Sequence, residues 1–375
     1  MCSFSKIFDQ FNWKDISLKI KNKTVDNVNQ AINKDKISLE DFMALISPSA
    51  TFYLKSIIQK AKKMTRKRFG NIINLFIPLY LSNLCSNECT YCGFSIKNSV
   101  KRKVLNEDEI ISECNKIYSM GYRNVLLVSG EHDKKVGVDY FYKCIYLIKQ
   151  YFSQISVEIQ PLTIKEYKKL KKIGLNGVIV YQETYQKESY KKYHLRGRKK
   201  DFYWRLDTPE RVGESGISKI GLGILIGLSS DWRVDYYILA NHLLYLQKKY
   251  WKSNYSVSFP RIQTCLGGIS QDKINNITNH ELVQLMCAFR LFFPEVEINL
   301  STRESPYFRD NILPIMVNNI SAGSSTQPGG YSKEKNELQQ FELNDHRSPN
   351  EMIEVIQNSG LQPVWKDWDN YLGND

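Results

Sequence analysis

Long apolar runs are missing from this chain of 375 residues. No stretch of 18 or more apolar residues occurs, so we expect no membrane-spanning helix. The segment Met1–Ser17 contains Asp9 and Asp15 and lacks the apolar centre of a signal peptide. These absences predict a cytoplasmic protein, whose cysteines stay reduced and whose clustered thiols indicate metal binding or catalysis rather than disulfides.

Acidic residues are outnumbered, with 39 Asp and Glu against 52 Lys and Arg, which gives a net charge of +13. Such an excess can indicate a nucleic-acid or membrane partner. The lysines are spread along expected helices, however, and the densest basic run, Lys60–Arg68, is typical of a solvated helix face. No RNA-binding motif accompanies them. We therefore expect neither a nucleic-acid partner nor a membrane partner.

Apolar residues make up 42% of the chain, enough for a large core. Short Val-, Ile- and Leu-rich segments alternate with amphipathic stretches from Leu75 onward, as expected of parallel strands covered on both faces by helices. The expected strands are Leu75–Ser82, Asn124–Ser129, Ile155–Gln160, Gly177–Gln182, Lys219–Gly227, Tyr255–Pro260, Glu295–Ser301 and Ile315–Ser321. Eight strands predict a parallel (β/α)8 barrel of the TIM type, and an open doubly wound sheet is the alternative.

Helix signals fit between these strands. Asn106 and Thr163 each precede a glutamate by three residues, the spacing of a capping box. Apolar spacing also predicts helices over 231–250 and 279–292. We divide the chain into a helical extension over 1–70 that covers one end of the barrel, the barrel over 71–332, and a helical tail over 333–375 that packs on it. The tail holds a helix near Pro349–Ser359 and an aromatic cluster at Trp365 and Trp368.

Three cysteines, Cys85, Cys89 and Cys92, lie within eight residues just after the first expected strand. In a barrel, the loops that follow strands carry the chemistry. Three thiolates on a four-iron cluster leave one iron open, and an open iron can bind the amino and carboxylate groups of another molecule. The alternatives are a zinc site or three unrelated cysteines, but zinc sites usually show a second cysteine pair or nearby histidines.

The remaining cysteines have a simpler interpretation. Cys114, Cys144 and Cys287 fall in helical patterns among apolar residues, where cysteine acts as a small buried hydrophobe. Cys265 follows the sixth expected strand and so lies on the side that carries the loops, although we favour a packing role there too.

The C-x-x-x-C-x-aromatic-C loop resembles the signature of the radical S-adenosylmethionine superfamily. The chain further resembles the tyrosine lyases of bacterial thiamine biosynthesis, also called 2-iminoacetate synthases. Similar segments follow one another in the same order: Ser82–Phe94, Val128–His132, Val180–Tyr185, Trp204–Pro209, Lys219–Leu228, Ser256–Arg261, Leu300–Ser305, Thr326–Tyr331 and Gln362–Asp369.

This resemblance implies a reaction. A reduced 4Fe–4S cluster gives an electron to S-adenosylmethionine, which breaks into methionine and a 5′-deoxyadenosyl radical. The radical abstracts a hydrogen from L-tyrosine, the family favouring the amino group over the phenol, and the Cα–Cβ bond breaks to give 2-iminoacetate (dehydroglycine) and p-cresol. A thiazole synthase partner uses the imine, and a flavodoxin- or ferredoxin-type protein supplies the electron.

The resemblance also implies residues that bind S-adenosylmethionine. Tyr91 would pack on the adenine, and the turn Ser129-Gly130-Glu131 would hold the methionine amino group, unless it only ends a strand. Glu183 would accept hydrogen bonds from the ribose, or else is a solvated loop acid. Arg205 would bind the cofactor carboxylate, or else forms a salt bridge at a helix start.

Gly221 and Gly223 occupy a strand that they weaken, which calls for an explanation. Close approach of the adenine to the backbone is one, and a bend of the barrel is the alternative. For L-tyrosine, the resemblance implies that Arg303 binds the carboxylate while Ser301 and Ser321 help to hold the amino acid. A surface ion pair between Arg303 and Glu304 is the alternative.

Other functions fit less well. The tyrosine lyase of hydrogenase maturation carries extra C-terminal cysteines, and this chain has none after Cys287. Biotin synthase needs cysteines on barrel strands, whereas Cys114 and Cys144 are expected in helices. The tryptophan lyase of thiopeptide biosynthesis shares the architecture but takes an indole substrate. A non-catalytic electron carrier usually closes its cluster with a fourth cysteine, which is not evident here.

Overall fold

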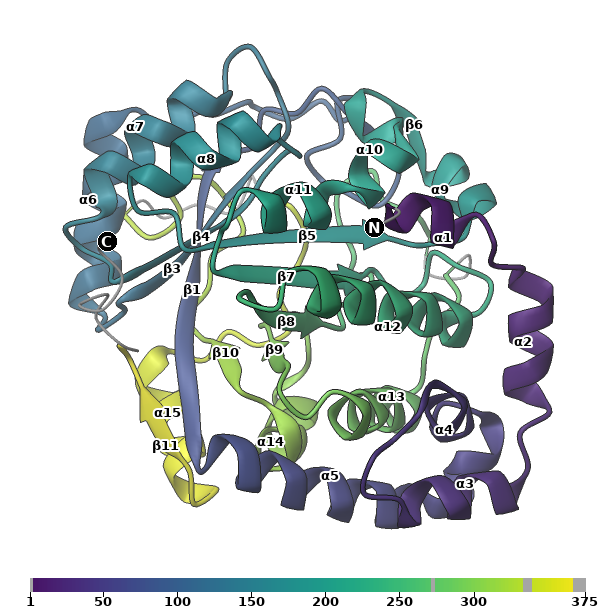
Figure 1. Cartoon of the computed structure of the whole chain (residues 1–375). Helices are drawn as coiled ribbons and strands as arrows, with labels where there is room; N and C mark the ends of the chain where they lie inside the picture. Colours follow the sequence, from purple (N-terminus) through teal and green to yellow (C-terminus); the bar gives the residue numbers. More distant parts are fainter. Residues whose placement is uncertain (1–2, 271–273, 333–338, 367–375) are drawn as a thin grey trace.

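Eight parallel strands close into a barrel in the computed structural model, which describes residues 3–270, 274–332 and 339–366. The ring closes where Asn74 and Phe76 of the first strand pair with Asn319 and Ser321 of the last. This confirms the predicted barrel and excludes the open sheet (Figure 1). In ring order the strands are β1 (Ile72–Ser82), β3 (Asn124–Ser129), β4 (Gln154–Glu158), β5 (Gly177–Glu183), β7 (Lys219–Ile224), β8 (Asn254–Ser258), β9 (Glu297–Leu300) and β10 (Asn319–Ser321).

Helices connect the strands and cover the outside of the barrel. The predicted capping boxes form at Asn106 and Thr163, which begin α6 and α8. The connecting helices are α6 (Glu107–Ser119), α7 (Val138–Ile148), α8 (Ile164–Lys172), α9 (Lys187–Tyr193), α10 (Phe202–Leu206), α11 (Thr208–Glu214), α12 (Trp232–Lys249), α13 (Asn279–Phe292) and α14 (Pro306–Met316). Cys114, Cys144 and Cys287 are buried in α6, α7 and α13, as predicted.

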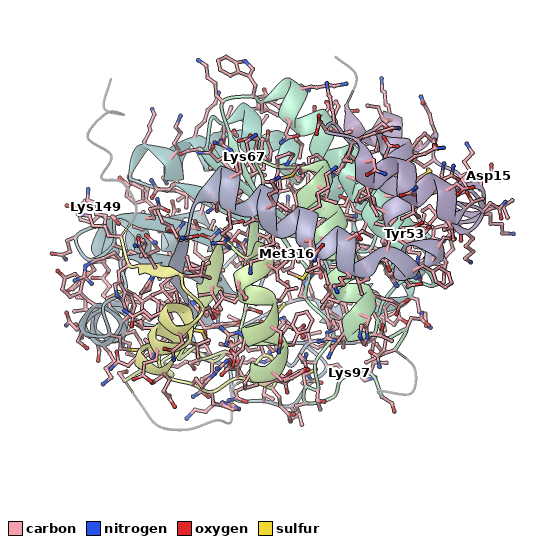
Figure 2. The ribbon with its side chains drawn as sticks, turned by 90° about the horizontal axis from the view of Figure 1, so that it is seen from below. Asp15, Tyr53, Lys67, Lys97, Lys149 and Met316 are labelled. Carbon is pink, nitrogen blue, oxygen red and sulfur yellow. The ribbon has the colours of Figure 1, made fainter. Side chains whose placement is uncertain are left out.

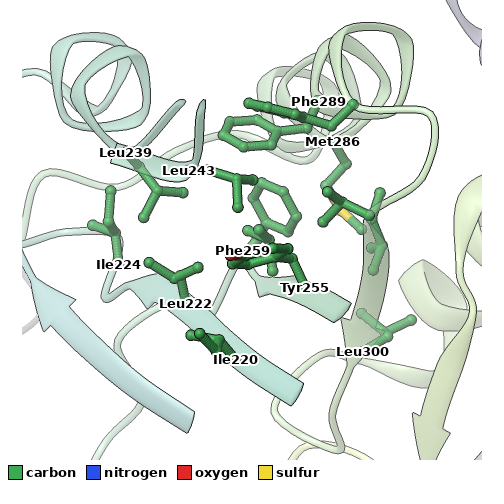
Figure 3. Close-up of a cluster of buried hydrophobic side chains, with 14 of the residues drawn as sticks. Ile220, Leu222, Ile224, Leu239, Leu243, Tyr255, Phe259, Met286, Phe289 and Leu300 are labelled. Atoms are coloured by element: carbon green, nitrogen blue, oxygen red, sulfur yellow. The ribbon is translucent and has the colours of Figure 1, made fainter. Parts of the chain in front are cut away.

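Side chains on the barrel strands point either outward, into the apolar layer beneath the helices, or inward, into the barrel. On β7, Ile220, Leu222 and Ile224 point outward into the apolar layer that also holds Leu239 and Leu243 of α12, as Figure 3 shows. Because side chains alternate along a strand, the residues between them face the barrel interior. In β7 these are Gly221 and Gly223, so this stretch of the inner wall carries no side chain.

The predicted strand Ile315–Ser321 is wrong over its first half. Ser305 caps a helix whose first residue is Pro306, and Phe308, Ile312 and Met316 continue its buried face with helical spacing. The helix therefore includes Ile315, and only Asn319–Ser321 forms a strand.

Several other strands end before the predicted residue. β4 stops at Glu158 rather than Gln160, β7 at Ile224 rather than Gly227, and β8 at Ser258 rather than Pro260. The apolar residues that follow these strands pack outside the sheet. Leu225, for example, belongs with Cys89 to a buried cluster beyond the strand ends.

The N-terminal extension is helical as predicted, but it does not cover an end of the barrel. It packs on the outer helices α12, α13 and α14, and Gln284 of α13 donates buried hydrogen bonds to Leu45 O (2.9 Å) and Ser47 O (2.8 Å). In Figure 2, the last extension helix runs from near Tyr53 past Lys67, beside Met316 of α14. The extension comprises α1 (Phe4–Phe8), α2 (Trp13–Lys21), α3 (Val25–Asn33), α4 (Leu39–Leu45) and α5 (Leu54–Phe69).

The C-terminal tail is not purely helical. After α15 (Pro349–Asn358), strand β11 (Gln362–Val364) pairs in parallel with the first residues of β1, which extends the barrel sheet (Figure 1). Trp365 then meets the edge of Tyr122, with ring centroids 5.0 Å apart. Trp368, the other member of the predicted aromatic cluster, lies outside the described residues, as does the rest of 367–375.

Over the residues that the structure describes, no helix combines the length and apolarity needed to cross a membrane.

A buried ion pair joins the tail to the barrel. Arg309 of α14 donates to Asp345, and their side chains are only 1% and 0% exposed. Removing one partner of such a pair leaves an uncompensated buried charge. We therefore expect Asp345→Ala to lower the free energy of unfolding by about 3–5 kcal/mol, measured by urea denaturation.

Asp310 provides the matched control. It also pairs with an arginine, Arg347, but its side chain is 40% exposed. We expect Asp310→Ala to cost about 0–1 kcal/mol. Equal losses in the two variants would contradict a special role for the buried pair.

Candidate active site

Two adjoining cavities open at the carboxyl ends of the strands. The larger, of about 140 Å³, lies inside the barrel. The smaller, of about 90 Å³, lies beside the loop that carries Cys85, Cys89 and Cys92. Seven residues line both: Val128, Glu158, Tyr181, Pro260, Arg303, Gln340 and Phe341. The site is therefore one continuous space with two chambers.

The cysteine loop is attached to the end of β3. Both the amide and the hydroxyl of Ser86 donate to Glu131 O, at 2.8 and 3.0 Å, and Asn87 Nδ2 donates to Glu131 Oε2 at 2.7 Å. A two-stranded sheet, β2 (Glu88–Cys89) with β6 (His194–Arg196), holds the middle of the loop. These bonds fix all three cysteines relative to the barrel.

Gly130 allows the loop to lie this close. A Cβ at this position would be 2.5 Å from Leu84 O, closer than such atoms approach, and would also make a tight contact of 3.2 Å with Cys85 Cβ. Gly93 is similar, because its Cβ would meet the carbonyl oxygens of Gln339 and Gln340 at 2.7 Å. The two glycines thus allow backbone segments to pack closely on either side of the cysteines.

The donor set fits an iron–sulfur cluster. All three cysteines line the smaller chamber. Cys85 Sγ accepts a hydrogen bond from Asn87 N at 3.5 Å and Cys92 Sγ one from Gln340 Nε2 at 3.7 Å, the kind of donor that stabilises cluster thiolates. Burial raises the pKa of the Cys85 thiol to about 11, so cluster binding must displace its proton.

A single metal ion fits less well. Ligands of one ion must all lie about 2–2.6 Å from one point. Within the described ranges, no three His, Cys, Asp or Glu side chains form a group that could hold a metal ion. Each cysteine of a cluster binds a different iron, so wider spacing is expected.

A buried network of charges forms the far side of the smaller chamber. Arg205 donates from Nη1 to Glu131 Oε1 at 3.0 Å and from Nε to Tyr181 O at 2.6 Å. Lys199 donates to Glu183 Oε1 at 2.6 Å. The predicted cofactor residues Glu131, Glu183 and Arg205 therefore come together, with two negative and two positive charges in balance.

Glu183 has an unusual backbone. Its φ of +70° is the only positive value at a non-glycine position in the part of the chain that the structure describes. Such strain is typical of functional sites, where the surroundings hold a residue in place. Here it turns the carboxylate at the end of β5 into the chamber. Glu183 is 6% exposed, so the alternative of a solvated loop acid is wrong.

Tyr91 and Ser129 are both fixed by hydrogen bonds. Tyr91 OH lies 2.7 Å from His194 Nε2, and His194 Nδ1 lies 2.7 Å from Tyr190 O. Burial lowers the pKa of His194 well below its usual value, so the neutral ring donates to the carbonyl and accepts from the tyrosine. Ser129 Oγ donates to Gly130 O at 2.8 Å, within the turn.

Gly221 and Gly223 have close neighbours on β5. A Cβ on Gly221 would lie 2.6 Å from Ile179 Cγ1, and one on Gly223 would lie 2.6 Å from Tyr181 Cδ1. Both glycines therefore make room for side chains that line the larger chamber. Their predicted contact with adenine stays a prediction.

Arg303, Ser301 and Ser321 all line the larger chamber. The guanidinium of Arg303 stacks on Phe341, 3.4 Å from the ring centroid. The alternative of an ion pair with Glu304 is wrong, because Glu304 pairs with Arg261 instead. Arg303 thus presents its charge to the cavity, as the predicted tyrosine contact requires.

Sequence reasoning missed three residues of the site. Glu158 was assigned to a strand interior, although a charge in an apolar strand could have marked the strand end. Lys199 belongs to a basic stretch that resembles a solvated surface. Gln340, which also accepts from Tyr80 OH at 2.8 Å, reaches the site from the tail, and no local pattern predicts it. Cys265 lines neither chamber.

Two family profiles match successive parts of the chain. The profile of the Radical SAM superfamily matches residues 79–238, which include the three cysteines. The profile of the Biotin and Thiamin Synthesis associated domain matches residues 258–362. Fold and site thus define a radical S-adenosylmethionine enzyme with a 4Fe–4S cluster.

Closer relatives narrow the assignment. The chain is 52% identical over 373 residues to the 2-iminoacetate synthase of Escherichia coli (strain K12), covering 100% of this chain and 98% of the relative. The Salmonella typhimurium enzyme of the same name matches equally, at 52% identity and the same coverage. The chain belongs to the 2-iminoacetate synthase family.

Solved structures agree on the fold. The FeFe-hydrogenase maturase HydG from Carboxydothermus hydrogenoformans superposes with a TM-score of 0.84 at 32% identity, over 98% of this chain and 84% of that one. Methylornithine synthase (PylB), at 20% identity, shares the fold with a TM-score of 0.71 over 90% of this chain and 97% of that one.

The contact at Gly130 generates a test. We expect Gly130→Ala to push the cysteine loop away from β3, with a strain of about 1–3 kcal/mol that weakens cluster retention. Iron and sulfide per chain after anaerobic reconstitution would measure the loss.

Gly174→Ala serves as the control, because Gly174 has a φ of +117° but no atom within 4 Å of its Cβ position. It should cost about 1–3 kcal/mol of stability yet leave the iron content unchanged. Full iron content in Gly130→Ala would show that the close contact is dispensable.

Proposed function

We propose that this protein is a tyrosine lyase that cleaves the Cα–Cβ bond of L-tyrosine into 2-iminoacetate and p-cresol, supplying the thiazole of thiamine. The observation that carries the proposal is the full-length 52% identity to 2-iminoacetate synthase. The three-cysteine loop supports it, because it lies beside a chamber lined by Arg303, an arginine that forms no ion pair with any carboxylate among the described residues. When bound, the cluster and S-adenosylmethionine supply a primary carbon radical that abstracts a hydrogen atom.

The first task of the protein is to hold the cluster and its cofactor. Cys85, Cys89 and Cys92 would hold the cluster. Ser129, Gly130 and Glu131 follow β3 beside it, and backbone groups of this turn would contact the methionine part of S-adenosylmethionine. The remaining cofactor contacts that we propose are Tyr91, Glu183, Arg205, Gly221 and Gly223.

Glu131 and Arg205 already pair with each other, so cofactor binding would share or rearrange this pair. Buried charged pairs hold their geometry well, which favours a pre-formed binding site.

The second task is to hold L-tyrosine in one orientation. Arg303 would bind the carboxylate, for which its paired donors are well matched, and Phe341 keeps the guanidinium in place. Ser301 and Ser321 line the same chamber and would add hydrogen bonds. Because an alkyl radical attacks the nearest hydrogen, this positioning decides which bond breaks.

Exclusion of water is the third task. Gln340 and Phe341 line both chambers from the tail side, and Gly93 N donates to Gln340 O at 2.9 Å. This segment closes the site over the cysteine loop, which protects a reactive intermediate from solvent.

The finer points of the assignment follow from the family. The 2-iminoacetate would pass to a thiazole synthase, a flavodoxin- or ferredoxin-type protein would reduce the cluster, and the enzyme would work in the cytoplasm. We propose neither a nucleic-acid nor a membrane partner.

Product analysis tests the proposal. Anaerobically reconstituted protein with dithionite, S-adenosylmethionine and L-tyrosine should release p-cresol and 5′-deoxyadenosine, measured by chromatography. Cys89→Ala should lose both products together, because it removes a cluster ligand.

Other outcomes have clear meanings. Deoxyadenosine without p-cresol would keep the radical enzyme and reject tyrosine as its substrate. Neither product from protein with a full cluster would reject catalysis and favour an electron carrier.

A further inference from the structure

Glu158 stands at the junction of the two chambers. It is the last residue of β4, in register with Val128 of β3, and it lines both cavities. Arg303 lines both as well. A carboxylate and a guanidinium therefore meet the same space, between the cysteines and the interior of the barrel.

Neither charge is neutralised by an ion pair. In the described part of the chain, no basic side chain lies within ion-pair distance of Glu158, and no carboxylate lies within that distance of Arg303. Their charged neighbours are already committed, Lys199 to Glu183 and Glu304 to Arg261. Burial and the negative charge of Glu183 raise the pKa of Glu158 to about 7, against the opposing effect of the positive charges of Arg303, Lys199 and Arg205.

An α-amino acid carries the complementary charges. Its carboxylate and its ammonium group are attached to one carbon, and this site offers one cation and one anion. We propose that Glu158 binds the α-amino group of L-tyrosine while Arg303 binds its carboxylate, so that Glu158 determines specificity for an amino acid over a simple carboxylic acid. The inference rests on the proposed function and adds the residue that recognises the amine.

This assignment also orients the substrate. With both charged groups at the junction, the aromatic ring extends into the larger chamber, which Phe76, Leu126 and Ile179 line with apolar surface. The amino group then lies at the junction, next to the smaller chamber that the cysteines line. Glu158 thereby holds the hydrogens on nitrogen beside the chamber that the cysteines line.

The test compares ligands with and without the amine. With reconstituted enzyme, S-adenosylmethionine and no reductant, calorimetry gives the Kd of L-tyrosine and of 3-(4-hydroxyphenyl)propionate, which lacks only the amino group. The Glu158→Gln variant loses a charge-assisted hydrogen bond to the amine, so its Kd for L-tyrosine should rise by roughly 10- to 100-fold. Binding of the deaminated analogue should be unchanged or tighter, because no carboxylate is then left unpaired.

Control variants separate recognition from damage. Glu188→Gln makes the same chemical change at an exposed position and should bind both ligands like the wild type. Glu158→Asp keeps the charge and should keep a preference for tyrosine over the analogue. Iron content and circular dichroism verify each variant, and Glu158→Asp carries the test if Glu158→Gln does not fold.

Four results would overturn the inference. If Glu158→Gln binds tyrosine as tightly as the wild type, and the wild-type enzyme releases p-cresol, the inference about Glu158 fails while the proposed function stands. Equal weakening of both ligands shows a structural role, and weaker binding of S-adenosylmethionine instead of tyrosine shows a cofactor contact. Wild-type protein that neither binds tyrosine nor releases p-cresol overturns the proposed function and the inference together.

Discussion

The contact between the cysteine loop and the end of β3 is the constraint on which the site depends. Two hydrogen bonds from Ser86 to the Glu131 carbonyl, and the missing side chain at Gly130, bring the loop against the barrel. Glu131 then continues into the charged network through Arg205, and this network reaches β5 at Glu183. This contact therefore sets both the position of the three cysteines and the shape of the chamber beside them.

Side chains alternate between the outer and inner faces of each strand, and this explains how the barrel can be both stable and hollow. Outward residues of β7 pack in a buried apolar layer beneath the helices, while the inward positions of the same strand are glycines. Space for a substrate thus arises without weakening the outer packing. The inner surface carries its charges at the strand ends, where chemistry is usually found in this fold.

Much of this architecture can be predicted because local sequence patterns determine it. Strand β3 was bounded correctly, and the cysteine spacing and the glutamates after strands indicated the site. The boundary between α14 and β10 was missed because a short apolar segment satisfies helical and strand periods alike. The pairing of Arg205 with Glu131 and the arrival of Gln340 beside Cys92 join distant parts of the chain, and no local pattern encodes them.

The tail supplies both the last parallel strand beside β1 and the residues that close the site. Gln340 and Phe341 reach Cys92 and Arg303 from almost the end of the chain. During synthesis on the ribosome, the cysteine loop is made about 250 residues before Gln340 and Phe341, which later cover it. The order of translation therefore leaves a period in which the tail does not yet cover the three thiols.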